Sequence, residues 1–206
     1  MPQHGSAYTS QQPPVNPAAT GHCYQECTMP FSQRHTTPHI VATLAGIALL
    51  GVAGSAFARD DLEARLKGFN EVPAVSSAAT GRFKASVDKA SNTIRYELSY
   101  SGLEGDVRQS HIHIGQRGVN GGITLWLCQT ATNPSPTLAT TPACPQSGTV
   151  NGVLSAADVI GPAGQGIAAM EIAEVLAAIR AGVAYVNVHS SKFPGGEIRG
   201  QLRDDD

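Results

Sequence analysis

The feature that most constrains the fold is an alternation of apolar and polar side chains that recurs in short runs between residues 62 and 202. In 93–100, for example, Ile94, Tyr96, Leu98 and Tyr100 alternate with polar residues. Successive side chains of a β-strand point to opposite faces, so this period of two predicts a strand with one apolar face. A chain with this pattern can bury its apolar residues only by closing a sheet or packing two sheets together.

Seven further runs have the same character, and Gly-, Asn- or Pro-rich segments separate them. They are 62–68, 81–88, 107–114, 123–128, 148–154, 185–189 and 197–202. One segment differs: in 168–181 the apolar residues Ile172, Val175, Leu176 and Ile179 have helical spacing, and Gly182 follows as an expected C-cap. A capping pattern at 155–158 predicts a short turn before it. The sequence thus predicts an all-β, Greek-key sandwich or barrel of about eight strands with one inserted helix.

The start of the chain has the organisation of an export signal. Residues 40–52 form a mainly apolar run that is too short to span a bilayer comfortably, and Ala56-Phe57-Ala58 is a cleavage motif. We expect 29–58 to be a signal peptide cut near Ala58–Arg59, and 1–28 to be disordered or an upstream extension created by a mis-called start. A retained anchor helix is the alternative. The mature domain would then be 59–206, exported to the periplasm or secreted.

Cysteine use agrees with export. Cys128 and Cys144 are the two cysteines of 59–206, and an even pair in an oxidising compartment favours a disulfide. Their spacing lacks the paired thiols of a zinc site. We therefore predict a structural disulfide between Cys128 and Cys144.

Charge and length narrow the class of partner. Residues 59–206 are long enough for one domain with a real core. The whole chain has a net charge of −2, and no basic stripe is present, which argues against nucleic acid. No second long apolar run follows residue 58, so we expect no transmembrane segment in the mature chain. The expected partner is an extracytoplasmic protein or a small ligand that the sequence does not identify.

All the histidines of the mature domain lie in two predicted strands: His111 and His113 in 107–114, and His189 in 185–189. Residues two apart on a strand share a face, so His111 and His113 should project side by side. Clustered imidazoles suit copper or zinc. A shared site requires the three rings to meet at one point, with ligand distances of about 2.0–2.1 Å.

Strand geometry adds polar neighbours to these histidines. Asn187 shares a face with His189, and Glu197, Arg199 and Gln201 share a face of the last strand. One reading is a three-His metal site, with Glu197 as a fourth ligand or as a partner that orients a ligand. Arg199, Asn187 and Gln201 would then bind an anion or a partner. The alternative is a hydrogen-bonded cluster with a structural or recognition role.

Two other candidates carry less weight. Ser110 adjoins His111, but neighbours on a strand point to opposite faces, so we identify no catalytic residue. Trp126 is flanked by two leucines and lies close to Cys128, and we expect it to pack in the core or against the disulfide.

The motifs of the mature domain resemble the CHRD (chordin-type) domain family. The resemblance covers about 62–203 and is carried by 68–75, 79–81, 110–115, 118–121, 179–190 and 194–202. It implies an immunoglobulin-like all-β fold and a single-domain exported protein. It implies no known activity.

A more distant similarity is to copper-zinc superoxide dismutase barrels. His111 and His113 look like the His-x-His pair of that family, His189 like its later copper ligand, and Arg199 like its anion-guiding arginine. The metal-bridging His and the zinc ligands of that family have no counterpart here. Two functions therefore stay open. The first is a non-enzymatic extracytoplasmic binding or structural module. The second is a copper-binding protein with a three-His site and weak dismutase-like activity.

Overall fold

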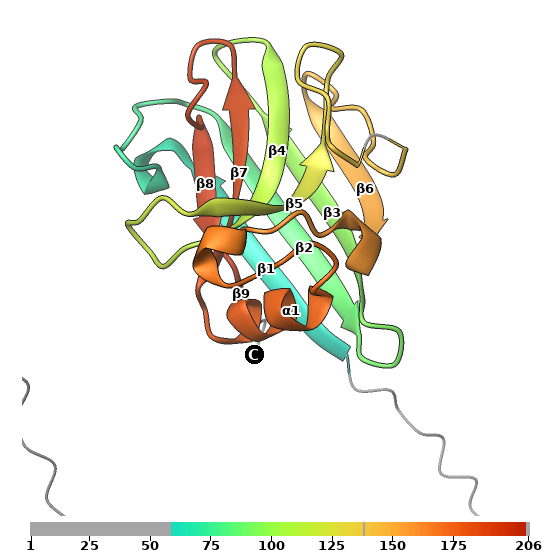
Figure 1. Cartoon of the computed structure of the whole chain (residues 1–206). Coiled ribbons are helices and arrows are strands. Elements are labelled where there is room, and N and C mark those ends of the chain that lie inside the picture. Colours follow the sequence, from blue (N-terminus) through green and yellow to red (C-terminus); the bar gives the residue numbers. More distant parts are fainter. Residues whose placement is uncertain (1–58, 138, 205–206) are drawn as a thin grey trace, which may run out of the picture. The chain divides into compact units, whose positions relative to one another are not determined.

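The structure, a computed structural model, describes residues 59–137 and 139–204 (Figure 1). The expected signal peptide and the residues before it lie outside this part of the chain. Its strands are β1 (Arg59–Lys67), β2 (Thr80–Asp88), β3 (Thr93–Ser101), β4 (Val107–Ile114), β5 (Gly122–Cys128), β6 (Gly148–Leu154), β7 (Ala184–Ser190), β8 (Ile198–Gln201) and β9 (Arg203–Asp204). The α-helix is α1 (Ile172–Arg180), and short 3-10 turns occupy Gly68–Asn70, Ala156–Asp158 and Ala163–Gln165. The expected all-β class with one inserted helix is confirmed.

The strands form one antiparallel sheet that curves into a nearly closed barrel. Its order is β5-β4-β7-β8-β1-β2-β3-β6, with β9 paired to β1. The pairing between β1 and β8, in the middle of the sheet, is the least extensive, because these strands pair only at Lys67 and Arg199. On one side of that pairing lie β5, β4, β7 and β8, and on the other β1, β2, β3 and β6. This single pair lets the two halves fold over one core, as in a sandwich, while remaining one sheet.

The core lies between these halves and follows the predicted alternation. On β3, residues Ile94, Tyr96, Leu98 and Tyr100 are buried and their neighbours are more exposed. Opposite them, β4 contributes Ile112 and Ile114, and β7 contributes Val186 and Val188. The period of two thus decides which side chains enter the core.

The helix is shorter than the predicted 168–181. It begins at Ile172 because Met170 has a left-handed backbone (φ 71°), which no α-helix can include. It ends before Gly182 (φ 69°), as the C-cap pattern predicts. The expected capping box at Ser155 and Asp158 is also present. No helix in residues 59–137 or 139–204 is long and apolar enough to cross a membrane.

The disulfide between Cys128 and Cys144 is formed. It ties the end of β5 to the far end of the loop that precedes β6, where Gln129 and Ala143 also form a bridge. The predicted covalent closure of the 129–143 loop is therefore confirmed.

A candidate metal centre on the outer face of the sheet

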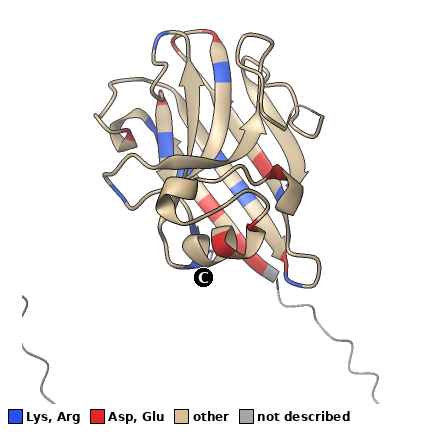
Figure 2. Ribbon diagram, in the orientation of Figure 1, with Lys and Arg blue, Asp and Glu red and all other residues tan. Residues whose placement is uncertain are grey.

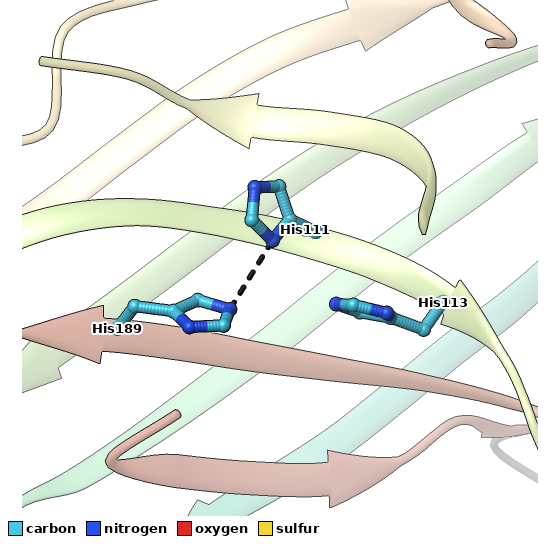
Figure 3. Close-up of side chains that lie close together, drawn as sticks. All are labelled: His111, His113 and His189. Atoms are coloured by element: carbon cyan, nitrogen blue, oxygen red, sulfur yellow. Dashed lines mark hydrogen bonds between the residues drawn. The ribbon is translucent and has the colours of Figure 1, made fainter. Parts of the chain in front are cut away.

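Three histidines come together on two neighbouring strands. His111 and His113 lie on β4, and His189 lies on β7, which pairs directly with β4 (Figure 3). One ring nitrogen from each residue lies within 4.8 Å of the others. The requirement that His189 reach the other two is met, because its Nε2 lies 3.2 Å from Nδ1 of His111.

The imidazoles project from the face opposite the core. Ile112 and Val188, their neighbours in sequence, belong to the hydrophobic core. The rings are nevertheless buried, with 0%, 7% and 6% of His111, His113 and His189 exposed. Loops that pack over the outer face make this burial possible, since a backbone carbonyl from each of two loops bonds a ring.

Two backbone carbonyls hold two of the rings. Nδ1 of His113 lies 2.9 Å from the carbonyl oxygen of Gly121. Nδ1 of His189 lies 2.9 Å from the carbonyl oxygen of Pro194. A carbonyl accepts only, so each ring donates its Nδ1–H and presents the Nε2 lone pair inward. Metal-binding histidines are commonly oriented by such a bond from the other ring nitrogen.

The environment keeps these rings uncharged. Burial, with a smaller contribution from His189 and His113, lowers the pKa of His111 to about 2. Burial lowers the pKa of His113 to about 4, although its bond to Gly121 opposes the shift. Burial likewise lowers the pKa of His189. Metal ions bind the neutral imidazole, so the site is in its binding form at neutral pH.

Trp126 packs on the ring of His111, whereas it was expected to pack in the core or against the disulfide. Its ring centroid lies 4.3 Å from that of His111, edge to face. The reason is register: β5 pairs Trp126 with His111, which turns the indole to the outer face. His111 Nε2 and Trp126 Nε1 are two of the five buried side-chain atoms of the described residues that have no hydrogen-bond partner, and Glu71 Oε1 is another. Buried polar atoms without partners are costly, and such atoms concentrate at functional sites.

Asn187 lies between the histidines. Its Oδ1 is 3.0 Å from Nε2 of His189 and 3.1 Å from Nε2 of His113. Its amide nitrogen borders the same space beside Gly196 as the buried carboxyl of Glu71, and Asn187 opposes the rise in the pKa of that carboxyl. Asn187 was expected to bind an anion or a partner, but its polar atoms face the histidines and Glu71.

Arg199 is held in place by the protein itself. Its guanidinium carbon lies 3.3 Å from the centre of the Tyr185 ring. It donates hydrogen bonds to Asn120 Oδ1 and the Val119 carbonyl. Tyr185 in turn stacks on His113 with centroids 4.7 Å apart. Arg199 thus anchors the loop that covers His113.

The remaining two expected residues do not join the cluster. The Glu197 carboxylate accepts hydrogen bonds from the Ser77 hydroxyl (2.7 Å) and the Glu104 backbone N–H (2.8 Å). Gln201 donates to the carbonyls of Gly115 and Gly182. Both are therefore engaged in fastening loops to β8.

A groove of about 640 Å³ lies beside the centre, and Glu71 and Arg199 belong to its wall. Four exposed cationic side chains also line it, namely Arg65, Lys67, Arg117 and Arg203, together with Glu63, which pairs with Arg82. None of these four cations forms an ion pair with another described residue. Elsewhere in the view of Figure 2, cationic and anionic residues are interspersed.

Sequence reasoning missed Glu71 and Tyr185. Tyr185 shares the strand period of Asn187 and His189, so the alternation was a usable signal. Glu71 had no such signal, because it enters from a loop that is distant in sequence. Only the loop's return across the outer face brings it to Asn187.

Comparison with known proteins identifies the family of this chain. No curated protein sequence and no solved structure matches the chain. A family model described as the CHRD domain matches residues 62–202, which is most of the chain and includes all three histidines. The match spans every strand of the sheet except the first three residues of β1 and both residues of β9. The chain therefore belongs to the CHRD domain family.

Proposed function

We propose that this CHRD domain is an exported, non-enzymatic module that binds a transition-metal ion through His111, His113 and His189. The observation that carries the proposal is the convergence of one nitrogen from each ring within 4.8 Å. Two rings are also fixed by backbone carbonyls, with their Nε2 lone pairs facing inward. A purely structural cluster would need these lone pairs to meet hydrogen-bond donors instead.

Copper is the metal we propose. Imidazole nitrogen suits Cu, Zn and Ni, and among the divalent first-row ions Cu²⁺ binds a given site of this kind most tightly. Zn²⁺ is the competitor when copper is scarce. Neutral, buried imidazoles need no proton release before either ion binds.

Metal analysis tests the proposal. The domain 59–206, stripped with a chelator and then dialysed against Cu²⁺ or Zn²⁺, should retain close to one equivalent. Replacing His111, His113 and His189 together with Ala should abolish retention. Ser110→Ala is the matched control, because Ser110 is buried on the same strand and its hydroxyl donates to a backbone carbonyl on β7. No retention by the wild type, or equal retention by the triple variant, would refute the proposal.

The copper-loaded domain also separates a binding module from a weak superoxide dismutase. Superoxide must reach a coordination position on the metal, whereas all three histidines are buried. We therefore expect superoxide consumption no faster than that of the same amount of copper in a solution of the triple His→Ala variant. A clear, His-dependent acceleration would establish the catalytic alternative.

The cationic groove supports a second binding role, toward an anionic extracytoplasmic partner or ligand. Four exposed cations without ion-pair partners line it, although the chain as a whole is weakly acidic. Unpaired like charges in a groove attract anions and accelerate their association. Arg65→Glu with Arg117→Glu should abolish salt-sensitive binding to dextran sulfate. Lys84→Glu with Arg95→Glu, two exposed cations of β2 and β3, should retain it.

Export is part of the proposal. The disulfide between Cys128 and Cys144 and the CHRD family membership support it. Residues 29–58 would be the signal peptide. Intact-mass analysis of the secreted or periplasmic product should give a chain that begins near Arg59, and a product that retains the apolar run 40–52 would contradict the proposed cleavage.

A further inference from the structure

We propose that Asn187 is a fourth ligand of the metal, bound through its side-chain oxygen, and that it closes the coordination sphere formed by the three histidines. This inference rests on the metal-binding function proposed above. It names the complete donor set, three imidazole nitrogens and one amide oxygen, and hence the class of ion that the site selects.

The distances fit such a set. Asn187 Oδ1 lies 3.0 Å from His189 Nε2 and 3.1 Å from His113 Nε2. His189 Nε2 lies 3.2 Å from His111 Nδ1. Ligands about 2.0–2.1 Å from a tetrahedral ion are separated by about 3.3 Å. Three of the six separations among these four atoms are thus already close to that spacing, and the three histidine nitrogens all lie within 4.8 Å of one another.

A count of protons shows what a cation would resolve there. A neutral imidazole has one N–H. In His113, Nδ1 faces the Gly121 carbonyl oxygen and Nε2 faces Asn187 Oδ1. The single ring proton can form a hydrogen bond to only one of these two oxygens. His189 has the same arrangement with Pro194 and Asn187. Asn187 Oδ1 therefore faces the Nε2 lone pairs of both His113 and His189, and these lone pairs repel its own. A metal ion bound between the three atoms would replace this repulsion with coordination.

The orientation of Asn187 is set by Glu71. Glu71 Oε1 and Asn187 Nδ2 both border the space beside Gly196, so the amide nitrogen lies on the side of the carboxyl, a group that accepts hydrogen bonds when ionised. That leaves Oδ1 directed at the rings. Gly196 permits this approach, because a Cβ there would lie 2.4 Å from Glu71 Oε1 and 2.9 Å from Asn187 Nδ2. Glu71 is thus a positioning residue for the fourth ligand.

The donor set determines which ions fit. An amide oxygen is a hard ligand and favours divalent ions over Cu⁺. Four protein ligands leave no open position, which is the arrangement of structural rather than catalytic sites. The site should therefore hold Cu²⁺, Zn²⁺ or Co²⁺ and disfavour the Cu⁺ state that redox cycling requires.

Cobalt spectroscopy on the domain 59–206 tests the inference. Wild-type protein with Co²⁺ should show the intense visible bands of a four-coordinate ion. Asn187→Ala admits water, so these bands should weaken and Co²⁺ affinity should fall by at least about tenfold. Asn187→Asp combined with Glu71→Gln keeps an oxygen at the same place without setting two carboxylates against each other, and this double variant should retain both the bands and the affinity. Asn151→Ala, at an exposed position of β6, is the control and should leave both unchanged.

The outcomes separate this inference from the function on which it rests. Absence of Co²⁺, Zn²⁺ and Cu²⁺ binding by the wild type overturns the proposed function itself. Wild-type binding with an unchanged spectrum and affinity in Asn187→Ala overturns the fourth ligand alone. If the Ala variant does not fold, the double variant Asn187→Asp with Glu71→Gln decides. Were the amide reversed, with its N–H groups donating to the imidazoles, the double variant would be less stable without metal than Glu71→Gln alone, which also overturns the inference.

Discussion

Glu71 shows how a single buried group can limit stability. Burial raises the pKa of its carboxyl to about 7, although Arg199 opposes the shift. Folding favours the protonated carboxyl. The contribution of this group to the free energy of unfolding is therefore full below pH 4.5 and is lost as the pH rises through 7. In the metal-free domain we expect Glu71→Gln to raise the unfolding free energy at pH 8, by at most about 3 kcal/mol. Urea unfolding at pH 8 and pH 5 checks this, and an equal gain at both values would contradict it.

His113 has the opposite dependence. Its folded-state pKa, about 4, lies below the ordinary value of 6.5, so the unfolded chain binds more protons between these values. Stability is full above pH 6.5 and is lost as the pH falls toward 4. Between pH 7 and pH 5 the metal-free domain should lose about 2 kcal/mol from this group. The His113→Gln variant should show a shallower slope over that range, and an identical slope would rule out this cause.

At the scale of elements, the disulfide matters most for the segment between β5 and β6. It closes a loop across a sequence separation of 16 residues. In the chain-entropy account, closing about 15 residues is worth about 3 kcal/mol. Cys128→Ser with Cys144→Ser should therefore lower the unfolding free energy by about that amount, and reduction of the wild type should do the same. Because the histidines lie on β4 and β7, metal stoichiometry should be unchanged, and its loss would show that the loop supports the site.

At the scale of the whole molecule, the metal centre exists only in the folded chain. His111 and His189 are 78 residues apart in sequence and meet because β4 pairs with β7. An ion that binds the folded state alone stabilises it, by about 2.7 kcal/mol at a concentration 100 times Kd. Calorimetry should show a melting temperature that rises with Cu²⁺ or Zn²⁺ and falls back on chelation. The triple His→Ala variant should not respond.

The sequence was sufficient to predict most of the fold. The alternation of β3 placed its residues correctly on the core side, and 107–114 and 148–154 are strands with the expected bounds. The start of α1 was placed too early, because nothing local marks the left-handed backbone at Met170. The disulfide followed from the number of cysteines and the expected compartment.

The site was predicted in part. The shared face of His111 and His113 follows from strand geometry, and their convergence with His189 was a hypothesis that the pairing of β4 with β7 confirmed. Glu197 shares the face of Arg199, yet its carboxylate turns to Ser77 and Glu104. A strand pattern fixes the side on which a side chain emerges, but not which loop it meets there.

The strands, the apolar core and the residues that emerge on the outer face could all be predicted from the amino-acid sequence, because each depends on a period of two along one segment. Only the tertiary structure decided that this outer face is buried, that Glu71 meets Asn187 and that the Asn187 oxygen faces two imidazoles. Those contacts join segments far apart in the chain. Their geometry depends on strand pairing and on loops that close over the sheet, and no local pattern encodes either.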